Sequence, residues 1–161
     1  MERVLRKVNS DPSLKKHLRD VSIFAVIIAA AAYLAVVAAA FVSDVLLGVK
    51  LLIITAAPYI VVSLARKIIN AKRPYEIYDF YEEPPKNKKG SGFPSRHVFS
   101  SFAIGTMICF FEPWLGIMVI ASGMAMGMCR VLLGIHFMRD VIAGAMIGVL
   151  TSVIGMLIVR I

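Results

Sequence analysis

The chain has 161 residues, of which 59% are hydrophobic, with a mean hydropathy of +0.80 and a formal net charge of +8. A soluble domain of this length cannot bury so much apolar surface, whereas a bilayer provides an apolar solvent for it. The composition therefore predicts an integral membrane protein. Its basic residues lie between apolar runs, which favours anionic headgroups or a phosphorylated ligand as partners and argues against nucleic acid.

Residues 1–20 form a basic segment with a weak amphipathic pattern, and we expect it to lie on the membrane surface. Residues 21–161 then form the transmembrane domain. Apolar spans are expected at about residues 21–42, 45–65, 97–111, 114–133 and 141–159. The third is short for a hydrocarbon core of about 30 Å. The sequence thus predicts an all-α bundle of about five transmembrane helices.

Small residues in the last two spans favour close helix packing. Gly123 and Gly127 are four residues apart, and so are Gly144 and Gly148. In lipid, this spacing lets two helices approach each other closely.

The only long non-apolar segment covers residues 66–96, and its prolines and glycines argue against a continuous helix. Its aromatic residues are Tyr75, Tyr78, Phe80 and Tyr81. They would form an interfacial belt or line an opening for lipid.

An antiparallel order of spans places three segments at one membrane face: residues 1–20, 66–96 and 130–140. Of the 18 Lys and Arg residues, all but Lys50 and Arg160 lie in these segments. The positive-inside rule therefore predicts a multi-pass protein of the cell membrane whose polar face is cytoplasmic.

The first candidate motif lies where the second span ends. Arg66 and Arg73 are seven residues apart, so they share a helix face if the span continues to Pro74, which would stop it. Basic residues at a helix end are also common as membrane anchors.

The second motif, Pro94-Ser95-Arg96-His97, opens the third span. Ser95 could cap the helix, and the free amides of a helix N-terminus bind anions. His97 by itself is as compatible with a structural role as with a functional one.

The third motif joins the last two spans. Arg130 ends the fourth, and His136 and Asp140 flank the start of the fifth. The four-residue spacing lets Asp140 accept a hydrogen bond from one imidazole nitrogen and leaves the other nitrogen free to attack. Otherwise, His136 is an interfacial polar residue.

Together these residues indicate phosphorus chemistry. Guanidinium groups can neutralise a phosphoryl group, one histidine can attack phosphorus, and the second can protonate the leaving oxygen. No Asp, His and Cys cluster suits a metal site, so we expect no metal and no other cofactor. Cys109 and Cys129 are expected to be unpaired, because they fall near opposite membrane faces.

The three motifs resemble those of the type 2 phosphatidic acid phosphatase superfamily, integral-membrane lipid phosphatases related in fold to vanadium haloperoxidases. That family carries a Lys, six residues and Arg-Pro; then Pro-Ser-Gly-His; then Ser-Arg, five residues, His, three residues and Asp. The corresponding residues here are Arg66 with Arg73-Pro74, Pro94 to His97, and Cys129-Arg130 with His136 and Asp140. The resemblance spans about residues 45–161.

The resemblance implies a haloperoxidase-like phosphatase core and a role for each matched residue. His136 corresponds to the nucleophile that becomes a phosphohistidine, Asp140 to the acid that orients it, and His97 to the general acid. The implied phosphate cradle is formed by Arg66, Arg73, Ser95 and Arg130, with backbone amides near Arg96 and His97.

The chain departs from the family pattern at three positions: Arg66 replaces a lysine, Arg96 a glycine and Cys129 a serine. Arg66 keeps the charge but not the geometry, and Arg96 could add a phosphate or diphosphate contact. The family usually has six spans, and the five expected here match the last five.

We therefore expect a metal-independent membrane phosphatase that hydrolyses a lipid phosphomonoester or diphosphate through a phosphohistidine. Polyprenyl phosphates and diphosphates, phosphatidic acid and phosphatidylglycerol phosphate are candidate substrates. A lipid phosphotransferase and a non-catalytic protein that binds anionic lipids are the alternatives. The sequence leaves the oligomeric state open.

Overall fold

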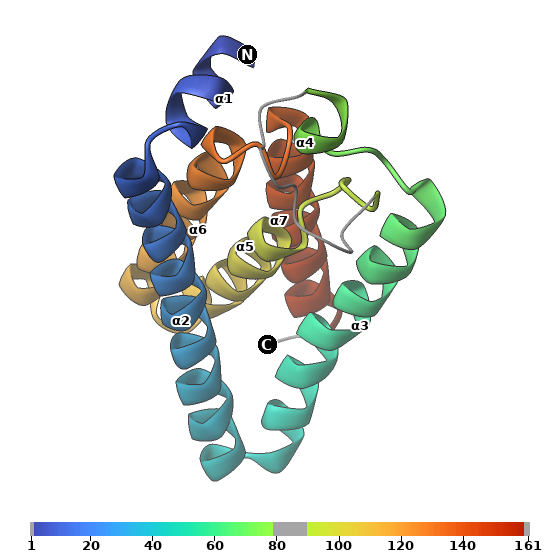
Figure 1. Cartoon of the computed structure of the whole chain (residues 1–161). Helices are drawn as coiled ribbons and strands as arrows, with labels where there is room; N and C mark the ends of the chain where they lie inside the picture. Colours follow the sequence, from blue (N-terminus) through green and yellow to red (C-terminus); the bar gives the residue numbers. More distant parts are fainter. Residues whose placement is uncertain (1, 79–89, 160–161) are drawn as a thin grey trace.

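The computed structural model describes residues 2–78 and 90–159, and these residues form helices and contain no strand (Figure 1). The helices are α1 (Glu2–Asn9), α2 (Pro12–Ser43), α3 (Val45–Ile69), α4 (Pro74–Ile77), α5 (Arg96–Cys109), α6 (Pro113–Leu132) and α7 (Met138–Val159). Among the described residues, four stretches are long and apolar enough to cross a membrane: Pro12–Ser43, Val45–Ile77, Pro113–Leu132 and Met138–Val159. The predicted all-α membrane bundle is confirmed.

The remaining apolar helix, α5, is the centre of the bundle. It has 14 residues, which at about 1.5 Å per residue make it shorter than the hydrocarbon core. Val98, Phe99, Met107 and Ile108 of this helix are fully buried. Its main contacts are with α6 and α7, and it lies between α2 and α3 in Figure 1. The third predicted span is therefore an interior helix that the longer helices enclose.

The N-terminal segment is divided differently from the prediction. Helix α1 buries Leu5 and Val8, and it packs against α2 and α6. Helix α2 then begins at Pro12, because the Asp11 carboxylate accepts hydrogen bonds from the amides of Ser13 (2.9 Å) and Leu14 (3.1 Å). The second half of the basic segment is thus the beginning of the first membrane helix.

Helix α3 ends at Ile69, before Pro74, so the condition under which Arg66 and Arg73 would share a helix face is not met. Asn70 adopts a left-handed conformation (φ 44°) and caps the helix at its C-terminal end. Pro74 instead begins the short helix α4, as its fixed φ allows. Arg73 lies in the connection between the two helices.

Glycines allow α7 to lie directly against α5. A Cβ atom on Gly144 would lie 2.6 Å from the backbone oxygen of Ser95, and one on Gly148 would lie 2.6 Å from that of Phe99. A buried hydrogen bond of 2.8 Å from the Ser152 hydroxyl to the Ala103 carbonyl joins the same helices. The close packing predicted from glycine spacing is confirmed here.

Helices α2 and α3 meet at the apolar end and diverge towards the polar end (Figure 1). Near their connection the Phe41 ring packs against Gly48, and the Tyr33 and Thr55 hydroxyls are hydrogen-bonded at 2.7 Å. Above these contacts the two helices separate on either side of α5.

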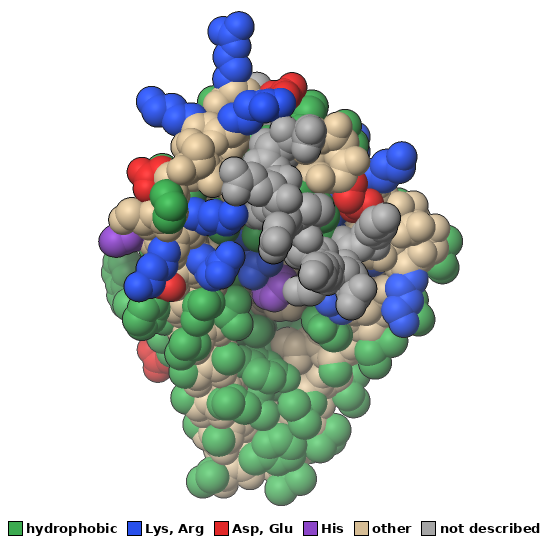
Figure 2. Space-filling model, in the orientation of Figure 1, with side chains coloured by type: hydrophobic (Ala, Val, Ile, Leu, Met, Phe, Trp, Pro, Cys, Tyr) green, Lys and Arg blue, Asp and Glu red, His purple; other side chains and the backbone are tan. Residues whose placement is uncertain are grey.

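The two ends of the molecule differ sharply in polarity. Lys and Arg side chains gather at the upper end in Figure 2, whereas the lower half of that view is largely hydrophobic. At the apolar end, the Lys50 ammonium donates to the Val159 carbonyl (3.4 Å) near the end of α7. The predicted concentration of basic residues at one face is confirmed for the described residues.

The α5–α7 interface should tolerate no added methyl group at its closest point. Gly148→Ala should lower the free energy of unfolding by about 1–3 kcal/mol, since its Cβ would press on the rigid backbone of Phe99 and Ala103. Gly155→Ala is the matched control, because there the three atoms nearest to the added Cβ belong to the side chain of Ile54 and not to rigid backbone. Thermal unfolding in detergent should show the larger loss for Gly148→Ala, and equal stability of the two variants would contradict this packing.

Candidate active site at the polar end

Backbone hydrogen bonds bring the three motifs together. The Ser95 amide donates to the Asp140 carbonyl (2.9 Å), which joins the start of α5 to the start of α7. The Gly92 amide donates to the Ala71 carbonyl (2.7 Å), and the Ser91 amide donates to the Asn70 side chain (3.2 Å). The segment before α5 is therefore fixed both to α7 and to the end of α3.

Arg66 anchors this segment from the last turn of α3. Its side chain is buried, and its two terminal nitrogens donate to the backbone carbonyls of Ser91 and Pro94. A guanidinium has five N–H groups, so this arrangement leaves donors for a further acceptor. Arg66 thus supports the loop that carries Ser95, a role that its sequence position did not reveal.

Arg73 is held in place by its neighbours in the chain. The Glu76 carboxylate accepts hydrogen bonds from the amides of Arg73 (3.0 Å) and Gly90 (2.9 Å). The Arg73 Nε donates to the Gly90 carbonyl (3.1 Å), and the guanidinium lies 5.8 Å from the centre of the Tyr75 ring. Although Arg73 is not on α3, this turn directs it back towards the site.

His136 and Asp140 form a buried pair. His136 lies in the connection between α6 and α7, and its Nδ1 is 3.6 Å from Oδ2 of Asp140; the side chains are 3% and 1% exposed. This distance is too long for a hydrogen bond, but it is within the range of an ion-pair contact. The Phe137 amide donates to the same Oδ2 (2.9 Å) and fixes the carboxylate. Because Nδ1 faces Asp140, Nε2 faces away from it.

Burial lowers the pKa of His136, although the Asp140 carboxylate opposes this effect. Arg73 and Arg130 add to the lowering through charge repulsion. The imidazole is therefore neutral at pH 7, with an unshared electron pair on one nitrogen. A neutral imidazole is the form that can act as a nucleophile.

Electrostatic interactions connect the remaining predicted residues to this pair. His97 interacts with His136, and also with Arg66, Arg96 and Arg130. Arg73 interacts with Arg66, His136 and Arg130, and Asp140 interacts with Arg66. The structure thus brings together the eight residues that the sequence singled out: His97, His136, Asp140, Arg66, Arg73, Ser95, Arg96 and Arg130.

Several buried polar atoms of this cluster have no hydrogen-bond partner among the described residues. They are the Ser95 Oγ, Arg130 Nε, His136 Nδ1 and Asp140 Oδ1. Ser95 is fully buried (0% exposed) and occupies the N-cap position of α5, but its side chain makes no capping bond. Buried polar groups are normally paired, and a concentration of unpaired ones is typical of functional sites.

A cavity of about 230 Å³ extends from this cluster between α2 and α3. It is lined by Val26, Ala29, Ala30, Tyr59, Arg96, His97, Ser100, Ser101 and Ile104. A second cavity of about 190 Å³ shares Tyr59, Ser100 and Ile104 with it and reaches Tyr33 and Thr55. The two together form a groove along α5 that runs from the charged end into the apolar part of the bundle.

The sequence reasoning missed Tyr59, Ser100 and Ser101 as lining residues. A signal was present, because Ser100 and Ser101 each lie four residues after a motif residue, Arg96 or His97, and so share its helix face. Tyr59 lies seven residues before Arg66 and shares its face of α3.

Other singled-out residues lie around the site. Tyr75 is buried, and Tyr78 packs edge-on against the Phe137 ring (centroids 6.4 Å apart). Neither lines the groove described above, and Phe80 and Tyr81 lie outside the described residues. Arg139 is 69% exposed and lies over the Phe137 ring, 5.1 Å from its centre.

Two features bear on metal and disulfide chemistry. Cys109 and Cys129 are unpaired, as expected. Within residues 2–78 and 90–159, no group of three or more His, Cys, Asp and Glu side chains is arranged to hold a metal ion. Among the described residues, the charged side chains that act electrostatically on the two histidines are arginines and Asp140.

Comparison with known proteins identifies relatives of this arrangement. The chain is 37% identical over 62 residues to the bacitracin transport permease protein BcrC of Bacillus licheniformis, a match that covers 38% of this chain and 30% of the relative. It is 39% identical over 61 residues to the lipid A 4'-phosphatase of Bacteroides thetaiotaomicron, covering 37% of this chain and 27% of the relative. The matched segments thus span less than a third of either relative.

The fold also has a counterpart among solved structures. The crystal structure of the first transmembrane PAP2 type phosphatidylglycerolphosphate phosphatase from Bacillus subtilis superposes with a TM-score of 0.71 at 20% identity. That superposition covers 99% of this chain and 84% of the other. In addition, the family model of the PAP2 superfamily matches residues 47–160, which include all three motifs. The chain therefore belongs to the PAP2 superfamily, as the three motifs predicted.

Proposed function

We propose that this protein is a metal-independent membrane phosphatase that hydrolyses a phosphomonoester or diphosphate on a lipid, with His136 as the nucleophile. The observation that carries the proposal is the buried His136–Asp140 pair beside four arginines, at the charged end of an apolar groove. The groove would hold the lipid tail while the phosphate occupies the charged cluster. Membership of the PAP2 superfamily supports the same reading.

The residues divide the reaction between them. Nε2 of His136 attacks phosphorus, and the bond from phosphorus to the lipid oxygen breaks as the N–P bond forms. His97, which is protonated when the negative charge of the phosphate is bound beside it, gives its proton to the departing oxygen. It then takes a proton from the water that attacks the phosphohistidine. The N–P bond breaks, and inorganic phosphate leaves.

The guanidinium groups of Arg66, Arg73 and Arg130 stabilise the charge that develops on the phosphoryl oxygens, together with the Ser95 hydroxyl. Guanidinium groups bind phosphate oxygens in pairs, and they act strongly where water is excluded. The Ser95 hydroxyl and the Arg130 Nε, both buried and without a hydrogen-bond partner in the described part of the chain, are suited to donate to these oxygens. Asp140 keeps the imidazole of His136 in the orientation that points Nε2 at phosphorus.

The central test is phosphate release by purified protein in detergent, with EDTA present, from a panel of phospholipid and polyprenyl phosphates. Wild type should release phosphate from at least one lipid, and His136→Ala should lower turnover by at least about 1,000-fold because no N–P bond can form. With ³²P-labelled substrate, wild type should carry an acid-labile label on the protein that His136→Ala lacks.

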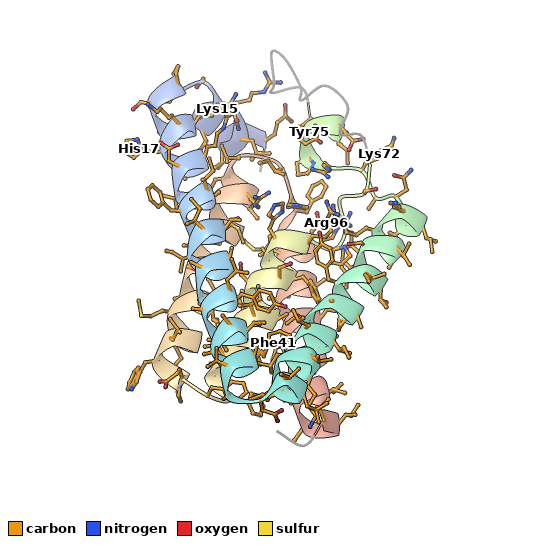
Figure 3. All side chains as sticks on the ribbon, turned by 90° about the horizontal axis from the view of Figure 1, so that it is seen from below. Lys15, His17, Phe41, Lys72, Tyr75 and Arg96 are labelled. Carbon is orange, nitrogen blue, oxygen red and sulfur yellow. The ribbon has the colours of Figure 1, made fainter. Side chains whose placement is uncertain are left out.

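The matched control for this test is His17→Ala, since His17 is an exposed histidine of α2 at the edge of the molecule in Figure 3. It should keep turnover within about twofold of wild type. Lipid binding without any turnover would instead identify a non-catalytic lipid-binding protein. Transfer of the label to an added alcohol in place of water would identify a phosphotransferase.

His97→Ala should discriminate between leaving groups. A general acid contributes about 100- to 10,000-fold when the departing oxygen is strongly basic, and much less for a weakly basic phenolate. In His97→Ala, the turnover of an alkyl phosphate should therefore fall far more than the rate of the first turnover of p-nitrophenyl phosphate. That first turnover should be visible as a burst of p-nitrophenol. Equal losses on both substrates in rapid-mixing assays would remove His97 from the proton-transfer role.

We further propose that the protein lies in the cell membrane with this site facing the cytoplasm, on the basis of its concentrated basic residues. Helix α7 runs from the polar end to the apolar end, so its last residues would be outside. Alkaline phosphatase fused to the C-terminus should then be active, and green fluorescent protein at the N-terminus should fluoresce. The reverse pattern would place the site outside the cytoplasm.

A further inference from the structure

Arg96 occupies a distinctive place between the charged cluster and the groove. It is the first residue of α5, it is exposed, and it lines the 230 Å³ cavity together with His97. It also interacts electrostatically with Arg66 and His97. No residue within 2–78 or 90–159 forms a hydrogen bond or an ion pair with its guanidinium. Figure 3 shows Arg96 between α2 and α3, not at the outer edge where Lys72 lies.

The reaction geometry determines which part of the substrate meets Arg96. In an in-line displacement at phosphorus, the leaving oxygen lies opposite the nucleophile. His136 is buried behind the cluster, whereas His97, the proposed proton donor to the leaving oxygen, lies on the cavity wall. The remainder of the substrate therefore extends from the phosphoryl group past His97 and into the cavity.

Arg96 faces the atoms that come directly after the leaving oxygen. In a monophosphate these atoms are the first carbons of the lipid, which offer no acceptor to a guanidinium. In a diphosphate they are the inner phosphate, whose oxygens suit bidentate hydrogen bonds. Beyond Arg96 the wall consists of Val26, Ala29 and Ala30, which suit a hydrocarbon chain. The order along the cavity is thus a charged group followed by an apolar wall.

We propose that Arg96 binds the inner phosphate of a lipid diphosphate, and that a lipid diphosphate is the substrate this site prefers over the monophosphate. The inference rests on the proposed phosphatase function. His136 attacks the terminal phosphorus, the bond to the bridging oxygen breaks, and the lipid monophosphate leaves with that oxygen and the proton from His97. Water then releases inorganic phosphate from His136.

The experiment compares two substrates with the same tail, farnesyl diphosphate and farnesyl monophosphate, on purified full-length protein. Wild type should have a kcat/KM at least about tenfold higher for the diphosphate. Arg96→Ala should lower this value about 10- to 100-fold for the diphosphate, because a charged hydrogen-bonding partner is lost, and should change the monophosphate value less than about threefold. Arg96→Lys should be intermediate, since it restores the charge without the two-pronged geometry.

Lys72→Ala is the matched control, because it removes another exposed cation from the same end of the molecule. It should leave the ratio of the two kcat/KM values unchanged. A wild-type preference for the monophosphate, or equal losses on both substrates in Arg96→Ala, would overturn the inference while leaving the phosphatase function intact. Absence of turnover on both substrates by folded wild type and across the lipid panel would overturn the phosphatase function itself.

Discussion

The site depends on how the buried guanidinium of Arg66 holds the segment before α5. Its hydrogen bonds to the Ser91 and Pro94 carbonyls pair two backbone acceptors of a loop that belongs to no helix, and so fix that loop in place. The same loop is bonded to α7 through the Ser95 amide and the Asp140 carbonyl. Because of these two attachments, the starts of α5 and α7 and the end of α3 can present charged groups to one point.

The short helix α5 explains how a charged cluster and an apolar groove can share one bundle. It is enclosed by longer helices, and the glycines of α7 let it pack backbone against backbone on one side. On the other side α2 and α3 diverge around it, and the Tyr33–Thr55 hydrogen bond lies where they come together again. A lipid phosphate has the same two-part character, with a charged head and an apolar tail.

Several features were predictable because they depend on local pattern. The apolar runs predicted the membrane helices, and the four-residue spacing of His136 and Asp140 predicted that their side chains lie together. The glycine spacing in α7 gave the close contact with α5. The end of α3 was not predictable in this way: the sequence left open whether the helix continues to Pro74, and Asn70 in a left-handed conformation ends it before that residue. The loop-holding role of Arg66 was also hidden, since its partners are backbone carbonyls of residues far along the chain.

The sequence by itself determined that the protein needs a lipid environment, that its basic residues gather at one end, and which residue types are available for chemistry. These features follow from composition and spacing, which are properties of the chain alone. Only the tertiary structure decided that these residues meet, which nitrogen of His136 faces Asp140, and that Arg96 lines a cavity between α2 and α3. These features depend on contacts between segments that are distant in sequence, and such contacts follow from how the helices pack and not from the pattern within any one of them.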